Sequence, residues 1–182
     1  MIHLLNNSST PKDATILLAK ARELVEPRVL VRDIRVSRRY IEIDTSMPEN
    51  VDVNELVDRL AMISPLANYE RIVERHMEKN EAIKLAIKLF NDEKYWSAHE
   101  ALESVWRSVT GDEKSILNGI ILVAAAFVHD EKDEKEICLS ILQRALKKIE
   151  GANGMYHEID LTRIRHLVSE TVSSGKIERF TI

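Results

Sequence analysis

The pair of residues in this sequence best suited to chemistry is a histidine and a glutamate one helical turn apart. His99 and Glu103 are four residues apart in a segment, 95–106, whose residue spacing predicts a helix, so both side chains lie on the same side. The only two tryptophans of the chain, Trp96 and Trp106, flank this pair on that side. An imidazole and a carboxylate between aromatic rings can bind a metal ion, move a proton or form a hydrogen-bonded pair. The segment is therefore the first candidate for a functional site.

Metal binding requires more donors than this pair supplies. Imidazole nitrogen and carboxylate oxygen suit a divalent ion of the zinc, iron, nickel or manganese type, but two protein ligands are too few for a closed site. The best third ligand is His129, because it ends the most apolar predicted helix. Asn118 lies eleven residues before His129 on the same side of that helix and could line the same cavity. Glu100 is rotated by about 100° from His99 around the predicted helix. The sequence therefore predicts a site at His99, Glu103 and His129 that binds a divalent metal ion or a small polar ligand. We expect Trp96, Trp106 and Asn118 to line this ligand site.

Two other interpretations of the pair stay open. If the pair is catalytic, His99 or Glu103 would act as the base of a hydrolytic reaction. Alternatively, Glu103 pairs with Arg107, and His99 fills a polar hole in the core as part of a structural buried polar network. The protein would then be a non-enzymatic interaction or regulatory module. The segment is not a zincin motif, because Glu103 stands where that motif has a second histidine. The sequence also contains neither a phosphate-binding glycine loop nor a Gly-x-Ser-x-Gly motif, so the question of enzymatic activity stays open.

A resemblance to a known family enters at these residues. The run LFNDEKYWSAHEALESVW (89–106), followed by LNGIILVAAA (117–126) and His129, resembles the family called domain of unknown function 309. That family has a motif of His, three residues, Glu, two residues and Trp, here His99, Glu103 and Trp106. The resemblance covers about residues 84–150 and implies a small all-helical domain whose motif has been suggested to bind metal or to act in catalysis. The chain departs from the family at Asn118, where Gln is frequent, and at 133–138, which reads DEKEIC where the family usually has Gly-Asn-x-x-Gly-Ala.

The second half of the sequence is expected to form the helices that position the site. From Met77 onward, apolar residues recur with a helical period, which predicts a bundle of five helices. The helix at 113–129 is apolar on nearly every face and should be central, packed by neighbouring helices or by a second copy in a homo-oligomer. Residues 177–182 alternate in polarity and are expected to form a strand or an extended arm. The predicted helices span 78–90, 94–109, 113–129, 137–149 and 160–173.

The first half of the sequence alternates between strand and helix patterns. Its order is β-α-β-β-α-β, which is the split βαβ arrangement of the ferredoxin-like fold. We therefore expect an α+β protein with a ferredoxin-like domain at 1–76 and an all-α helical bundle at 77–182. The predicted strands span 1–5, 29–36, 40–45 and 68–75, and the predicted helices span 11–26 and 51–63.

An arginine-rich hairpin in the first half suggests a sheet face that could bind single-stranded RNA. Its arginines, at 28, 32, 35, 38 and 39, alternate with Asp33, Glu42 and Asp44, which can pair with them across the hairpin. Residues 1–76 contain 11 Lys or Arg and 12 Asp or Glu, so this half has no net positive charge. We therefore expect a solvated charged sheet face rather than a surface for nucleic acid or another partner.

Composition and charge exclude several classes of protein. The 182-residue chain is 45% hydrophobic and 31% charged, and its net charge of −4 gives no bulk attraction to nucleic acid or to anionic membranes. The first residues lack the basic and apolar regions of a signal peptide, and the longest apolar run, 120–128, has half the length of a membrane helix. A single cysteine, Cys138, excludes an intrachain disulfide. We therefore expect a cytoplasmic protein without a membrane partner.

Overall fold

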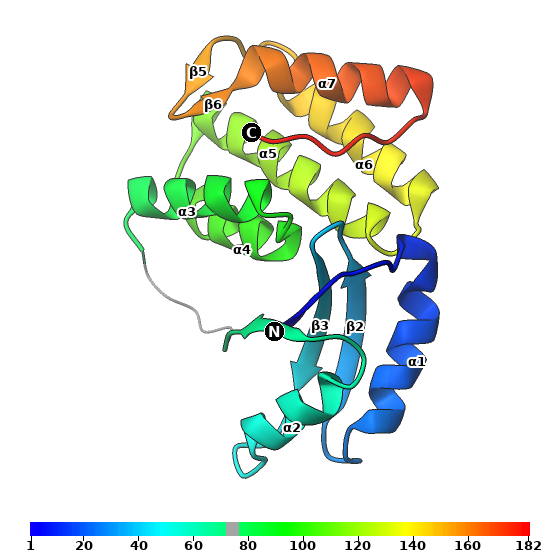
Figure 1. Cartoon of the computed structure of the whole chain (residues 1–182). Coiled ribbons are helices and arrows are strands. Elements are labelled where there is room, and N and C mark those ends of the chain that lie inside the picture. Colours follow the sequence, from blue (N-terminus) through cyan, green and yellow to red (C-terminus); the bar gives the residue numbers. More distant parts are fainter. Residues whose placement is uncertain (72–76) are drawn as a thin grey trace. The chain divides into compact units, whose positions relative to one another are not determined.

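The computed structural model of the 182-residue chain describes residues 1–71 and 77–182 (Figure 1). These residues form two compact units. The first contains residues 1–71 and the short segment 131–133, and the second contains residues 77–130 and 134–182. The first unit is α+β and the second is helical, so the predicted fold class is confirmed.

The first unit is a four-stranded antiparallel sheet with helices between its strands. The strand order is β2-β3-β1-β4, with β1 paired antiparallel to both β3 and β4. This order and the alternation of strands and helices are those of the predicted ferredoxin-like fold. The elements are β1 (Ile2–Leu5), η1 (Pro11–Asp13), α1 (Ala14–Leu24), β2 (Leu30–Val36), β3 (Tyr40–Ser46), α2 (Val53–Leu60) and β4 (Leu66–Tyr69).

Period-two alternation gives the sheet one apolar face. Ile2 and Leu4 of β1, Ile34 of β2, and Ile41 and Ile43 of β3 are buried in a core that also includes residues of α1 and α2. The β2–β3 turn lacks glycine and is closed by a backbone hydrogen bond, from the N–H of Ser37 to the carbonyl oxygen of Tyr40 at 2.9 Å, and by the Ser37 side chain. The Ser37 hydroxyl oxygen accepts hydrogen bonds from the backbone N–H groups at positions 39 (3.2 Å) and 40 (2.9 Å). This bonding accounts for a tight hairpin without the usual turn residues.

Two expectations for the first unit require correction. The last strand, predicted at 68–75, spans Leu66–Tyr69. Residues 72–75 of the predicted strand lie outside the described residues, as does residue 76, the last residue of the predicted first domain. The predicted pairing of charges across the hairpin is confirmed. The prediction of a solvated face is wrong for the central pair, because Arg35 is 2% and Glu42 is 5% exposed. Alternation indicates which face a strand residue occupies and does not indicate whether that face is covered.

The second unit confirms the five predicted helices within the described residues. The α3–α4 hairpin is followed by α5, which packs against both α4 and α6, and α7 packs against α6 (Figure 1). A short hairpin between α6 and α7 was not predicted, and residues 177–182 are an extended arm rather than a strand. The elements are α3 (Lys79–Asn91), α4 (Tyr95–Trp106), α5 (Gly111–Asp130), α6 (Lys135–Lys148), β5 (Met155–Tyr156), β6 (Ile159–Asp160) and α7 (Leu161–Ser174).

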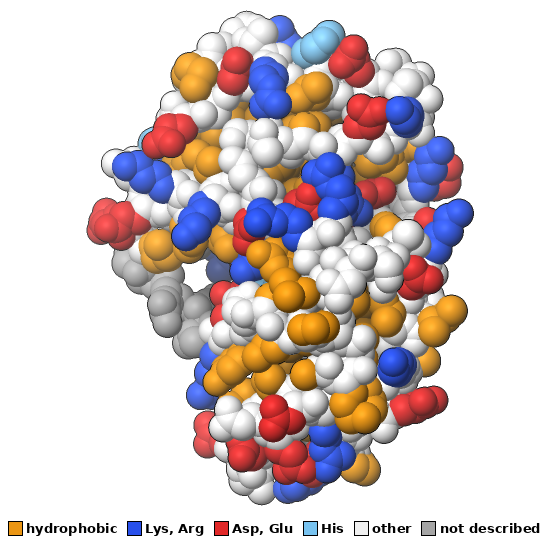
Figure 2. Space-filling model, viewed as in Figure 1, with side chains coloured by type: hydrophobic (Ala, Val, Ile, Leu, Met, Phe, Trp, Pro, Cys, Tyr) orange, Lys and Arg blue, Asp and Glu red, His pale blue; other side chains and the backbone are white. Residues whose placement is uncertain are grey.

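Helix α5 is the central helix of this unit. Nine of its residues are buried, and its apolar faces pack against neighbours in the same chain. Gly119 allows a close approach to the C-terminal end of α6, because a Cβ added at this position would lie 2.3 Å from Cγ2 of Ile149, the residue after the helix. No helix in the described part of the chain is both long and apolar enough to cross a membrane. Charged side chains of both signs occur on each unit in the view of Figure 2, in keeping with the small net charge.

Candidate metal site

The helix α4 presents its polar side chains next to a buried apolar stripe. Tyr95, Ala98, Leu102 and Val105 recur at spacings of three and four residues, and all four are buried in the core of the second unit. His99 follows Ala98 by one residue, so it lies beside this stripe, at the border between core and solvent. This position explains why the imidazole is partly buried while the carboxylates next to it remain accessible.

Three potential metal ligands converge on this part of α4. His99, Glu100 and Glu103 each offer one ligand atom, and these atoms lie within 4.8 Å of one another. His99 Nε2 is 3.9 Å from a carboxylate oxygen of Glu100. Metal–ligand bonds of about 2.0–2.2 Å require donor atoms roughly 3–3.5 Å apart. Small rotations of the two glutamate side chains would therefore bring the donors to the spacing of a bound ion.

The third member of this group differs from the one expected. His129 was the predicted third ligand, but it is not part of the group; its Nδ1 lies 2.5 Å from Oε2 of Glu134 at the end of α5. Glu100 takes its place, although its Cα is rotated from that of His99 around the helix. A glutamate side chain has three rotatable bonds and can reach back toward a neighbouring residue, which the helical-wheel argument ignores. The structure thus brings together two of the three predicted ligands and adds Glu100.

The predicted ligand-site residues have different surroundings. The ring of Trp96 stacks on that of His99, with centroids 5.7 Å apart and planes inclined by 14°. The ammonium group of Lys114 lies 4.4 Å from the centroid of the Trp106 ring, a cation–π contact. Asn118 is half-buried in the first half of α5. Trp96 therefore contacts the three-donor group directly through His99, whereas the Trp106 ring contacts Lys114 of α5.

Two buried nitrogens of this helix have no hydrogen-bond partner. They are Nδ1 of His99 and Nε1 of Trp106. No hydrogen bond or ion pair joins His99 to Glu103 among the described residues; Glu103 instead lies 3.6 Å from Nη2 of Arg107, in the predicted pair of residues four apart. Both partners of that pair are at least one-third exposed, so solvent screens it strongly. The arrangement is an open cluster of donors rather than a closed hydrogen-bonded network.

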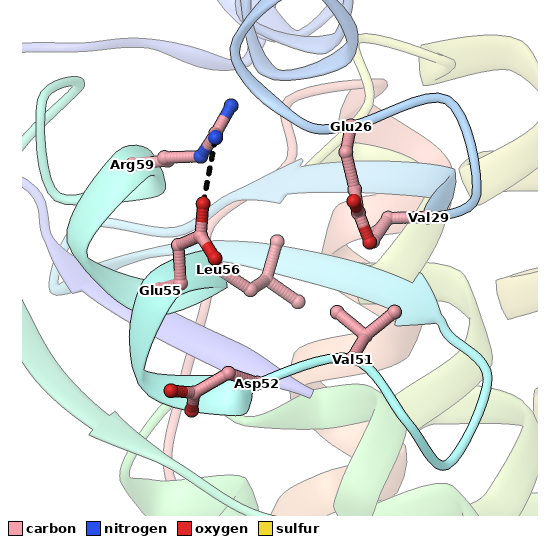
Figure 3. Close-up of a pocket in the computed structure, with 7 residues that line it drawn as sticks. All are labelled: Glu26, Val29, Val51, Asp52, Glu55, Leu56 and Arg59. Atoms are coloured by element: carbon pink, nitrogen blue, oxygen red, sulfur yellow. Dashed lines mark hydrogen bonds and ion pairs between the residues drawn. The ribbon is translucent and has the colours of Figure 1, made fainter.

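A small pocket of the first unit also gathers carboxylates (Figure 3). Asp52 accepts a hydrogen bond from the N–H of Asn54 and caps α2, while Glu55 pairs with Arg59 at 2.7 Å. Glu26 pairs with Arg28 at 3.1 Å. Each carboxylate therefore already has a structural partner, which makes this pocket a weaker candidate than the group on α4.

Comparison with known proteins places the donor group inside a family segment. Residues 83–141 match the model of a family described as a domain of unknown function (DUF309). The predicted resemblance is confirmed. The matched segment contains all of α4 and α5, and hence His99, Glu103, Trp106 and Asn118. Among curated proteins, none matches the chain. The DUF309 description names no activity, so the chemistry of the site has to be argued from its geometry.

Proposed function

We propose that α4 of the DUF309 segment binds a divalent transition-metal ion through His99, Glu100 and Glu103. The observation that carries the proposal is the convergence of three donor atoms within 4.8 Å. One imidazole and two carboxylates form a donor set suited to zinc, cobalt, nickel or manganese. All three ligands come from one helix, and the side chains are 22%, 43% and 34% exposed, so water would complete the coordination. A site of this kind binds reversibly and leaves coordination positions for a second ligand.

The same geometry argues against a purely structural role for the pair. A structural network would join the imidazole to a carboxylate and engage that carboxylate with a second protein donor. Among the described residues no direct bond joins His99 to Glu103, and the side chains of Glu100 and Glu103 are 43% and 34% exposed. These features support a ligand-binding role over the interaction-module alternative. The roles of His99 or Glu103 as a catalytic base, and of His129 as a ligand, stay predictions.

Cobalt binding to tag-free protein tests this proposal. Co²⁺ titration followed by visible absorption, with Zn²⁺ competition and calorimetry, should show one ion per wild-type chain. H99A should weaken binding by at least tenfold, because it removes the only nitrogen donor of the group. E100Q and E103Q should each weaken it by a smaller factor, because each removes one of two carboxylates.

The chain offers a matched control on α7. His166 and Glu170 are also four residues apart on one helix, with Nε2 and Oε2 separated by 3.5 Å, but both side chains are largely exposed. H166A should leave the Co²⁺ affinity unchanged. Equal binding by the wild type and H99A, or loss of binding in H166A, would reject the site on α4.

We also propose that the two units are separate domains, 1–76 and 77–182, and that the metal site requires only the second. A chain consisting of residues 77–182 should then fold and keep the Co²⁺ affinity of the full protein.

The single cysteine supports a reducing compartment, and we keep the expectation of a cytoplasmic location. Absence of a nucleic-acid partner and assembly of a homo-oligomer through the bundle also stay predictions, which binding assays and light scattering would test.

A further inference from the structure

The arm at residues 177–182 packs against the core of the second unit. It turns back after α7 and runs beside that helix in Figure 1. The surface that it contacts, which we call the arm groove, is formed by the end of α3, the α3–α4 turn and the C-terminal part of α5. Its contact residues are Phe90, Asn91, Glu93, Phe127 and Asp130.

The backbone of the arm is held by side chains. Asn91 Nδ2 donates to the main-chain oxygen of Ile182 at 2.9 Å, and Asn91 Oδ1 accepts from the N–H of Ile182 at 2.8 Å. Arg163 Nη1 donates to the carbonyl oxygen of Thr181 at 2.7 Å. An amide that pairs with both backbone groups of one residue copies the bonding of a neighbouring β-strand. Such a clamp recognises an extended backbone whatever its side chains are.

Two adjacent arm residues occupy pockets of matching chemistry. The Arg179 guanidinium, 8% exposed, lies between two acids, with Nε 2.6 Å from Asp130 Oδ2 and Nη1 3.7 Å from Glu93 Oε2. The centroid of the Phe180 ring lies 5.2 Å from the ring centroid of Phe127 and 6.2 Å from that of Phe90. A partly buried ion pair and an aromatic cluster together select an Arg-Phe sequence over other pairs.

The backbone at Glu93 supports a role in recognition. Glu93 adopts a φ of +61°, in the left-handed region where a residue other than glycine is strained by about 1–2 kcal/mol. Glycine would relieve that strain but would remove the carboxylate that faces Arg179. The α3–α4 turn therefore keeps the Glu93 carboxylate next to Arg179 although this backbone conformation is unfavourable for glutamate.

The arm is anchored at one end and loosely packed at the other. A cavity of about 420 Å³ lies between the last turns of α7 and the start of the arm, where Lys176 and Glu178 are exposed and pair with each other. The contacts described above all involve residues 179–182. Release of the arm therefore requires breaking these contacts and the packing of Ile177 against the core, but no unfolding of a helix.

From these contacts we propose that the arm groove is a peptide-recognition site. Its ligand is an extended segment of another protein with an Arg-Phe pair followed by two residues, and the arm is its resident, displaceable ligand. The proposal is independent of the metal site, because it uses none of the donors on α4. A tethered ligand competes at an effective concentration that reaches the millimolar range for short flexible linkers. An external peptide should therefore bind weakly unless the arm is released.

Fluorescence anisotropy with a labelled peptide of sequence KIERFTI tests this proposal in the full-length chain. The double variant R179E/F180A releases the arm and should bind the peptide at least tenfold more tightly than the wild type. Adding N91A to this variant should weaken peptide binding severalfold, because the backbone clamp is lost. K176A, an exposed change in the same arm, should behave as the wild type does, and a peptide carrying R179E and F180A should not bind.

A second measurement covers the case in which the released variant does not fold. Millimolar KIERFTI peptide added to the wild-type chain should speed hydrogen exchange in the segment 177–182, because the peptide displaces it. No acceleration at several millimolar peptide, or a folded R179E/F180A variant that binds no more tightly than the wild type, would overturn the proposal. A wild-type dimer that R179E abolishes would also overturn it, because the groove would then hold the arm of a second copy.

Discussion

The two units each contain a cluster of histidine and glutamate, and the clusters differ in what surrounds the carboxylates. In the first unit, Glu42 lies 3.0 Å from His3 Nε2 and 2.5 Å from Arg35 Nε, and all three side chains are at least nine-tenths buried. In the second unit, Glu100 and Glu103 lie beside His99, and Glu103 is 3.6 Å from the exposed Arg107. The same residue types therefore form a closed network in one unit and an open donor group in the other.

Strand register accounts for the closed cluster. Arg35 pairs with Glu42 across β2 and β3, and Glu42 pairs with His3 across β3 and β1, so the three side chains form a row on one sheet face. Both oxygens of Glu42 are engaged by protein donors, which leaves none for a metal ion. Each cluster retains one buried imidazole nitrogen without a partner, so the difference lies in the carboxylates. The closed cluster thus has a buried guanidinium beside its carboxylate, whereas the carboxylates of the open cluster stay accessible to solvent.

Removing the arginine from the closed cluster should have the largest effect on stability. R35M leaves Glu42 buried without its cation, and we expect the free energy of unfolding to fall by about 3 kcal/mol. Urea unfolding followed by far-UV circular dichroism measures this loss, because both tryptophans lie in the second unit. R32M removes an ion pair of the same hairpin whose arginine is 52% exposed, and should cost less than about 0.5 kcal/mol. Similar losses in the two variants would show that the buried Arg35–Glu42 pair stabilises the fold no more than the exposed Arg32–Asp44 pair does.

Acid should weaken the closed cluster in particular. Burial by itself raises the pKa of Glu42, but hydrogen bonds and charges from His3 and Arg35 outweigh it, and the net pKa is below the ordinary value for glutamate. The depressed pKa contributes stability above the unfolded-state pKa of about 4.3, and this contribution disappears as the pH falls through the folded-state value. The stability difference between the wild type and E42Q should therefore narrow between pH 6 and pH 3. A constant difference across that range, measured by urea unfolding at each pH, would show that the Glu42 charge does not stabilise the fold.

Changes in the open cluster should have the smallest effect on stability. H99A and E103Q should each alter the free energy of unfolding by less than about 1 kcal/mol, because partly exposed side chains without buried partners contribute little. Tryptophan fluorescence during urea unfolding reports this change directly, since both tryptophans lie on α4. A loss of about 2 kcal/mol or more in H99A would instead support the structural-network interpretation.

The sequence by itself determined the elements and the donor pair. The alternation of strand and helix patterns located most elements of the first unit, and the helical period located the five helices of the second unit, to within a few residues. Motif spacing on α4 identified His99 and Glu103, because residues four apart on a helix are always neighbours. These features depend on local geometry, which the chain carries in its own periodicity.

Only the tertiary structure decided which residues far apart in the chain come together and which faces are covered. Side-chain rotation decides that Glu100 lies with His99 and Glu103, and tertiary contacts bring His129 to Glu134 instead. The burial of Arg35, and the docking of Arg179 between Glu93 and Asp130, depend on packing between segments distant in sequence. Periodicity orients a side chain relative to its own element, but burial and contact depend on neighbouring elements, which local sequence does not specify.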